Sequence, residues 1–179
     1  MLDKKLTEEQ VSTVWATLKK RYHAKVKEKK KSLLMKIAAK MVPMGEKEFM
    51  TYVTTVRKTI YYPDSHEIGH GTQDDLVRQV ELAAHEFIHV TQNIGYKYLF
   101  SSARLAKHET DAFIATMEMH HYLTGVVWPV SYFLLKLKAY GVVELDLKYA
   151  EVKLGAARKM VKQGIYQSDT VKIIIGVLE

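Results

Sequence analysis

Hydrophobic residues recur at helical spacing along most of this chain, and that periodicity predicts a mostly helical protein. The first such stretch follows Thr7, where Thr7 and Gln10 form a helix-start box: the threonine caps the helix and the glutamine reaches back. An apolar stripe then runs through residues 11–22.

The pattern continues after a lysine-rich run at residues 25–31, with apolar positions resuming at 33–41 before Pro43. We therefore expect one long helix or two consecutive helices in this N-terminal segment. A run of lysines usually forms a solvated helix face, although it also fits a nucleic-acid or anionic-surface contact. No aromatic residues are interleaved with these lysines, so the solvated face is the favoured interpretation.

The segment from Glu48 to Tyr62 changes character. Threonine, β-branched and aromatic residues are frequent in it, and Gly45 and Pro63 bound it, so it predicts strand. A new helical pattern begins near Thr72 or Gln73 and runs through residue 92.

The C-terminal half again has helical spacing. Gly125 and Pro129 divide a weakly charged stretch at residues 122–135 into two segments, each too short to span a membrane. Residues 145–163 predict an amphipathic helix with basic residues on its outer side, and Ser168 can open a last short helix.

One motif in this pattern carries chemistry. His85 and His89 are four residues apart, so on a helix they lie on the same face, one turn above the other, where both imidazoles can bind one metal ion. Glu86 is placed to reach a water beside the metal without binding the metal itself. This H-E-x-x-H arrangement is typical of a zinc site with a glutamate as general base.

The same letters occur a second time, from His66 to His70. That copy follows the turn residues 63–65 and contains Gly69, with Gly71 just after it, and two glycines this close weaken a helix. We therefore expect a loop there, and we assign the metal to the downstream copy. Zinc retained after the loss of His89 would reverse this choice.

A catalytic zinc site takes a third protein ligand. Glu109 stands twenty residues after His89, in a second stretch of helical spacing that can pack against the first and deliver a carboxylate to the metal. The series His85-Glu86-x-x-His89 followed by Glu109 resembles the gluzincin branch of the zincin metallopeptidases. The finer pattern, with Gln92 and with Ala112 after Glu109, is similar to small bacterial and phage zincin-like proteins.

The resemblance covers roughly residues 50–120, and it implies an α+β fold in which a small sheet precedes the metal helix and holds an extended substrate on its edge strand. Many gluzincins carry an aspartate where this chain has Phe113. Asp111 or Gln92 is then expected to support a zinc-bound histidine. The further candidates for a supporting or oxyanion-stabilising role are His70, His120, Tyr122 and Tyr166, for which structural roles remain open.

We expect one domain over residues 1–179, with an N-terminal basic helical segment (1–44), a strand region with the metal-site helices (45–124) and C-terminal helices (125–179). The absence of cysteine excludes disulfides and thiolate metal sites. The formal net charge of +7 suggests an anionic partner or surface. Residues 1–6 carry no apolar signal-peptide core, so we expect a cytoplasmic protein, or a virion component if the chain derives from a phage.

The function expected from these observations is zinc-dependent hydrolysis of peptide bonds, with one Zn²⁺ per chain, Glu86 as general base and a peptide or protein as substrate. Two alternatives stay open. The first is a zincin-like structural or assembly protein, for example of a phage particle, with a vestigial or structural metal site. The second is a basic module that binds nucleic acid or a membrane surface, with incidental histidines.

Overall fold

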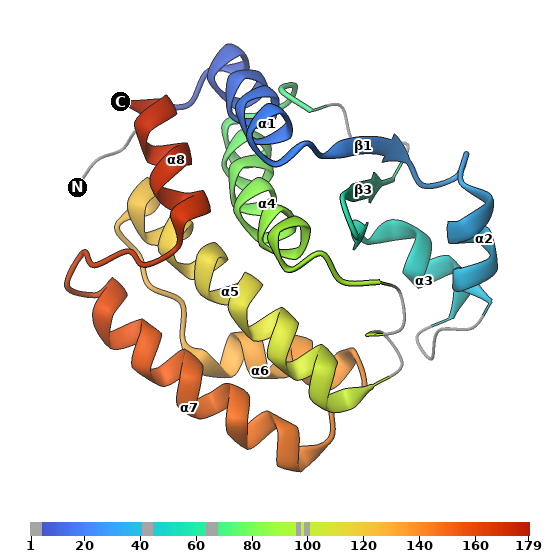
Figure 1. Cartoon of the computed structure of the whole chain (residues 1–179). Coiled ribbons are helices and arrows are strands. Elements are labelled where there is room, and N and C mark those ends of the chain that lie inside the picture. Colours follow the sequence, from blue (N-terminus) through green and yellow to red (C-terminus); the bar gives the residue numbers. More distant parts are fainter. Residues whose placement is uncertain (1–4, 41–44, 64–67, 96–97, 99–100) are drawn as a thin grey trace.

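The structure is a computed structural model that describes residues 5–40, 45–63, 68–95, 98 and 101–179. The described chain is α+β and mostly helical, with one small sheet at its side (Figure 1), as the periodicity predicts. The elements are α1 (Glu8–Tyr22), β1 (Lys25–Glu28), α2 (Leu33–Ala39), α3 (Glu46–Thr51), β2 (Thr54–Val56), β3 (Thr59–Tyr62), α4 (Gln73–Gln92), α5 (Ser102–Thr124), α6 (Val130–Ala139), α7 (Glu144–Val161) and α8 (Asp169–Leu178). None of the described helices is both long enough and apolar enough to cross a membrane.

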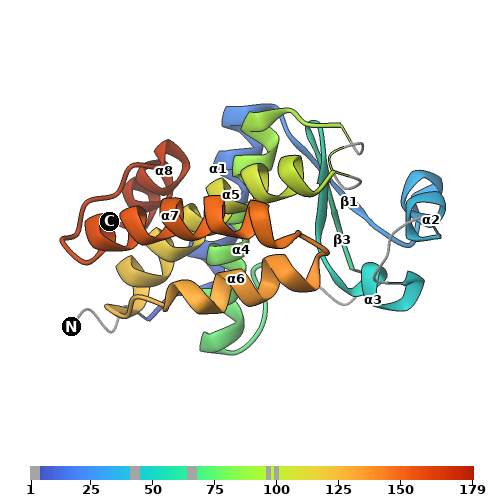
Figure 2. The same ribbon diagram turned by 90° about the horizontal axis from the view of Figure 1, so that it is seen from below.

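Helices α4 and α5 form the centre of the molecule and pack against each other more extensively than any other pair of described elements. α1 and α8 pack on α4, whereas α7 packs on α5 from the opposite side (Figures 1 and 2). The start of α4 is fixed by a capping box, in which Thr72 accepts from the backbone N–H of Asp75 and the Asp75 carboxylate accepts from that of Thr72. Asn93 ends the helix in the left-handed conformation.

Three hydrophobic clusters hold these elements together. One lies among α1, α4, α5 and α8, with Phe87 and Trp15 packed edge to face at its centre. A second lies among α5, α6 and α7 around Phe133, and a third, smaller one joins α2 and α3 to the sheet. The central helices thereby have apolar neighbours on several sides, and their polar residues concentrate on the remaining face.

The sheet has the strand order β1-β3-β2, with β1 parallel and β2 antiparallel to β3. The prediction of one long helix or two consecutive helices up to Pro43 was therefore wrong in part, because a strand separates α1 from α2. His23 adopts the left-handed conformation and ends α1, and from Lys25 the chain alternates between exposed and half-buried side chains as it pairs with β3. A strand partner thirty-four residues away in the sequence overrides the local helical spacing.

The strand predicted from Glu48 to Tyr62 is correct only in its second part. Residues up to Thr51 belong to α3, which follows Gly45 and buries Phe49, and the two strands after it form a hairpin. Arg57 takes a positive φ of 53° at the hairpin turn. The turn therefore divides what reads as one apolar segment.

The lysine run is not uniformly solvated, because Lys29 is fully buried. Its ammonium group donates to the carbonyls of Phe49 (2.5 Å) and Tyr52 (2.7 Å) and to Oγ1 of Thr54 (2.7 Å). Burial lowers the pKa of Lys29 to about 7, although the negative charge of Glu86 opposes this shift. Lys25 and Lys27 on β1, which ends just before Lys29, are exposed, as predicted.

Candidate metal centre

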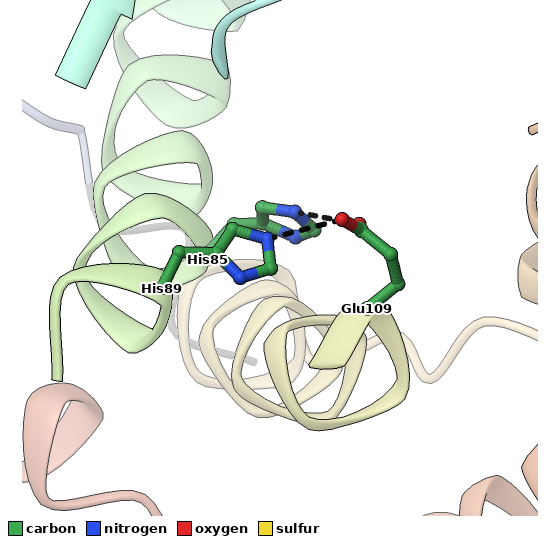
Figure 3. Close-up of side chains that lie close together, drawn as sticks. All are labelled: His85, His89 and Glu109. Atoms are coloured by element: carbon green, nitrogen blue, oxygen red, sulfur yellow. Dashed lines mark ion pairs between the residues drawn. The ribbon is translucent and has the colours of Figure 1, made fainter. Parts of the chain in front are cut away.

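Two helices place three ligand-bearing side chains around one point. His85 and His89 lie one turn apart on α4, and Glu109 faces them from α5 (Figure 3). The Nε2 atom of His85 lies 3.4 Å from Oε2 of Glu109, and Nε2 of His89 lies 3.3 Å from Oε1. One ligand atom from each residue lies within 4.8 Å of the others. The three residues expected to hold the metal are thus brought together.

Hydrogen bonds on the far side of each ring set the imidazole tautomers. The hydroxyl of Thr116 donates to the carbonyl of Ala112 (3.0 Å), so its oxygen accepts from Nδ1 of His85 (3.2 Å). The amide oxygen of Gln92 accepts from Nδ1 of His89 (3.0 Å). With Nδ1 of each ring held as a donor, the neutral form of each imidazole has its lone pair on Nε2, on the side of Glu109, and this is the form that binds a metal.

Glu109 and His89 are buried, and each favours the charged form of the other. Burial raises the pKa of Glu109, but the charge of His89 and hydrogen bonds from both histidines outweigh burial and hold that pKa well below its ordinary range. Burial lowers the pKa of His89, but the Glu109 carboxylate outweighs it and raises the pKa to about 9. A proton shared with a buried carboxylate stands where a cation would bind, so the site favours positive charge.

This donor set fits zinc. Two neutral imidazoles and one carboxylate are ligands that Zn²⁺ takes in catalytic sites, where a fourth position is left for water or substrate. Calcium and magnesium sites are built from oxygen ligands, so a site with two imidazole nitrogens is not of that kind.

Glu86 lies beside the triad in a defined orientation. It is only 4 % exposed, and it accepts a hydrogen bond of 2.7 Å at Oε2 from the hydroxyl of Thr55 on β2. Glu86 also lines the cleft that the triad faces. One carboxylate oxygen is thus engaged by the sheet, and the group is oriented toward the same space as the metal ligands.

The cleft has a volume of about 1050 Å³. Its walls are one face of α4, the segment from α3 to β2 and the aromatic side of α6. β2 is an edge strand that pairs with β3 on one side, and Thr54 and Thr55 of this strand line the cleft. An edge strand that borders a cleft is a place where an extended peptide can be bound by main-chain hydrogen bonds.

The four residues expected around the ligands have different positions. Gln92 supports His89 directly, and its amide nitrogen donates to Asp111 at 3.3 Å, so both are linked to the site. Asp111 also binds Lys153 of α7. His120 contacts Glu81 at 2.7 Å and stacks on Trp128, two residues that line the far part of the cleft.

Tyr166 does not reach the cleft. It forms a hydrogen bond with His121 (2.9 Å), and neither it nor Tyr122 is among the described residues that line the cleft. Two other tyrosines, Tyr98 and Tyr140, do line it.

Neither of these tyrosines was predicted from the sequence to lie at the site. Burial, followed by the negative charge of Glu109, raises the pKa of each phenol above its ordinary value, so both stay protonated and can donate a hydrogen bond. No spacing relative to the H-E-x-x-H motif points to Tyr98 or Tyr140, because the folding of loops and of α6 alone brings them to the cleft.

The upstream H-E-x-x-H copy lies in part outside the described residues, which include neither His66 nor Glu67. Its described part, from residue 68 onward, is not helical before Gln73, in agreement with the expected loop. Gly69 has φ +89°, and a Cβ atom there would lie 2.1 Å from Oγ of Ser12 on α1. His70 turns toward Glu8, with 3.3 Å between Nδ1 and Oε2.

The assembled site brings together three side chains that offer ligand atoms for one divalent cation and places a carboxylate beside them, in a cleft bordered by the edge strand β2. Comparison with protein-family models, with curated proteins and with solved structures found no match for this chain.

Proposed function

We propose that this chain is a zincin-like zinc-dependent metallopeptidase. The observation that carries the proposal is the convergence of Nε2 of His85 and Nε2 of His89 on Glu109, with Glu86 oriented into the same cleft. A structural zinc site is typically closed by four protein ligands. Among the residues that the structure describes, three such ligands converge, and they border a cleft of about 1050 Å³.

Each residue then has a role. His85, His89 and Glu109 would hold zinc, which when bound supplies a Lewis acid that acidifies water and polarises a carbonyl group. Glu86 takes a proton from the attacking water and passes it to the leaving amine. Thr55 keeps Glu86 oriented through its hydrogen bond, and Tyr140 offers a protonated phenol to the oxygen of the scissile carbonyl.

The substrate class that fits this cleft is an extended peptide. The outer edge of β2 would pair with the backbone of such a chain, and this mode of binding requires no fixed side-chain sequence. The aromatic wall formed by Trp128, Tyr132 and Tyr140 can receive apolar side chains.

Two measurements test the proposal. The purified protein should contain about one zinc per chain by elemental analysis, and His89→Ala should lose it. Glu86→Gln should retain zinc but lose cleavage of a mixed peptide library followed by mass spectrometry, whereas the exposed control Glu9→Gln should cleave like the unaltered chain. Full cleavage by Glu86→Gln would exclude Glu86 as the general base.

The alternative, a structural or assembly protein with a metal site that does not turn over, predicts a different result. Zinc would be bound and lost with His89, but no peptide in the library would be cut by the unaltered chain. If the protein stays folded without metal and never binds zinc, the site is neither a catalytic nor a structural zinc site.

A further inference from the structure

Helix α7 has two apolar faces, and only one of them is buried. The inner face packs on α5 and α6. The opposite face presents Leu145 (77 % exposed), Tyr149 (46 %) and Val152 (75 %), followed by the exposed Ala156. The helix lies along the lower edge of the molecule in Figure 1, and it lies in front in Figure 2, which is seen from below. The outer side of the helix carries basic residues, as expected, at Lys148, Lys159 and Lys162, and it also carries this apolar stripe, which was not expected.

The outer stripe has the spacing of a helix–helix seam. Its four residues follow one another at intervals of four, three and four positions, which is the a/d spacing of a coiled coil. A surface helix that packs only on its own domain needs one apolar face, and the inner face of α7 already serves that purpose. The second seam therefore fits another helix.

The charges of the exposed face are self-complementary. Glu144, Lys148 and Glu151 are exposed in its N-terminal half, while Lys159 and Lys162 are exposed at its C-terminal end. Two copies of α7 side by side and antiparallel bring the acidic end of each to the basic end of the other, and their helix dipoles are also opposed favourably.

We propose that α7 is the contact surface for a second copy of this chain, in an antiparallel two-fold pair. In that arrangement Leu145 packs opposite Ala156 of the partner copy and Tyr149 opposite Val152, so that each large side chain meets a smaller one. Glu144 of each copy lies within reach of Lys159 of the other. A two-fold contact of this kind is closed and stops at the dimer.

The contact leaves the candidate metal centre open, because no residue of α7 is among the described residues that line the cleft. It is also small. An eighteen-residue helix is about 27 Å long, so one helix pair buries less surface than a typical stable interface. We expect association in the micromolar range rather than an obligate dimer.

The lack of native cysteine makes crosslinking specific. A mixture of Leu145→Cys and Ala156→Cys chains, distinguished by mass, should form mixed disulfide dimers at least tenfold faster than either chain pairs with itself. The two positions are eleven residues apart, so like positions are too far from each other for a disulfide in the antiparallel pair. Faster self-pairing would overturn the antiparallel arrangement. The control is Leu33→Cys, which changes an equally exposed leucine of α2. Mixed with Ala156→Cys chains, it should form mixed disulfide dimers no faster than either chain pairs with itself.

Sedimentation equilibrium provides the second arm. Val152→Asp should remain monomeric at concentrations where the unaltered chain dimerises, with an unchanged circular dichroism spectrum. Glu144→Lys and Lys159→Glu should each weaken the dimer about tenfold, and the double variant should regain the lost affinity. A monomeric unaltered chain at several hundred micromolar, or no recovery in the double variant, would overturn the proposal whatever the outcome of the zinc measurements.

Discussion

The hydroxyl of Thr55 on β2 donates to the carboxylate of Glu86 on α4 across 2.7 Å, and both side chains are buried. This hydrogen bond joins the edge strand to the helix that carries the two histidines. It engages one oxygen of Glu86, so the direction of the other is set by the sheet. A group that must meet a water in a fixed position benefits from such support.

Removal of this hydrogen bond should impair turnover without loss of metal. We expect Thr55→Val, which keeps the side chain's shape, to lower kcat for peptide cleavage by about tenfold or more while zinc content stays at one per chain. The matched control is Thr91→Val, because Thr91 is exposed near the end of α4 and its hydroxyl only donates to the carbonyl of Ile88. Wild-type kcat in Thr55→Val would show that Glu86 needs no support from β2.

Gln92 should matter for metal affinity rather than for turnover. Its amide oxygen accepts from Nδ1 of His89 at 3.0 Å and so keeps the lone pair of Nε2 available. Loss of such a partner typically weakens metal binding by about 10- to 100-fold. Gln92→Leu should therefore lose zinc to a competing chelator at a chelator concentration about 10- to 100-fold lower than the unaltered chain requires.

Gln92→Glu provides the contrasting variant for that competition experiment. It retains an acceptor for Nδ1 of His89 and should retain most of the affinity. Equal affinity of the leucine variant and the unaltered chain would mean that the α4 backbone alone orients the ring.

The parts of the site that could be predicted from the sequence are those that one helix defines. The four-residue spacing of His85 and His89 is converted directly into a shared face, and a capped, strongly periodic segment made α4 predictable. Glu109 followed from a second periodic segment. Gln92 also lies on α4, three residues beyond His89, so its position near the ligands required no knowledge of the tertiary fold.

The parts that could not be predicted depend on partners far away in the chain. β1 exists because it pairs with β3, and Lys29 is buried because α3 and β2 supply three acceptors around its ammonium group. Thr55, Tyr98 and Tyr140 reach the cleft from three separate segments. None of these placements leaves a periodic signal in the sequence, since each results from tertiary packing.

The pKa values of the metal-free triad predict how zinc binding depends on pH. The pKa of His89 is raised to about 9 by the neighbouring Glu109, against the effect of burial, so at pH 7 the ring carries a proton that zinc must displace. Zinc binding should release about one proton per chain near pH 7, and the apparent affinity should rise with pH up to about 9. Calorimetry at constant pH in buffers of different ionisation enthalpy measures this release directly.

The same raised pKa has a consequence for the metal-free protein. Because the folded-state pKa of His89 lies above its unfolded value, the stabilisation it gives is complete below about pH 6.5 and is lost as the pH rises through about 9. The metal-free chain should therefore lose stability over this range, and the loss should be absent in His89→Ala. If the difference in the free energy of unfolding between the two proteins does not change with pH, His89 is not protonated in the folded metal-free chain.

Lys29 predicts the opposite slope. Burial lowers its pKa to about 7 in the folded protein, so between about pH 7 and pH 10 the unfolded chain binds more protons than the folded one. The contribution of Lys29 to the free energy of unfolding should then increase with pH, by at most about 1.4 kcal/mol per pH unit. Denaturant unfolding of the unaltered chain and of Lys29→Met, measured from pH 6 to pH 10, should give a difference that grows with pH.

The variant should also be less stable at every pH, because two carbonyls and the hydroxyl of Thr54 lose their donor, at about 1–3 kcal/mol for each group left unsatisfied. Lys27→Met changes an exposed lysine on β1 and should alter neither the stability nor its pH dependence. A pH-independent difference for Lys29→Met would mean that the three acceptors hold the ammonium group charged to its ordinary pKa. In that case the buried charge, rather than a neutral amine, links β1 to α3 and β2 at every pH at which the protein is folded.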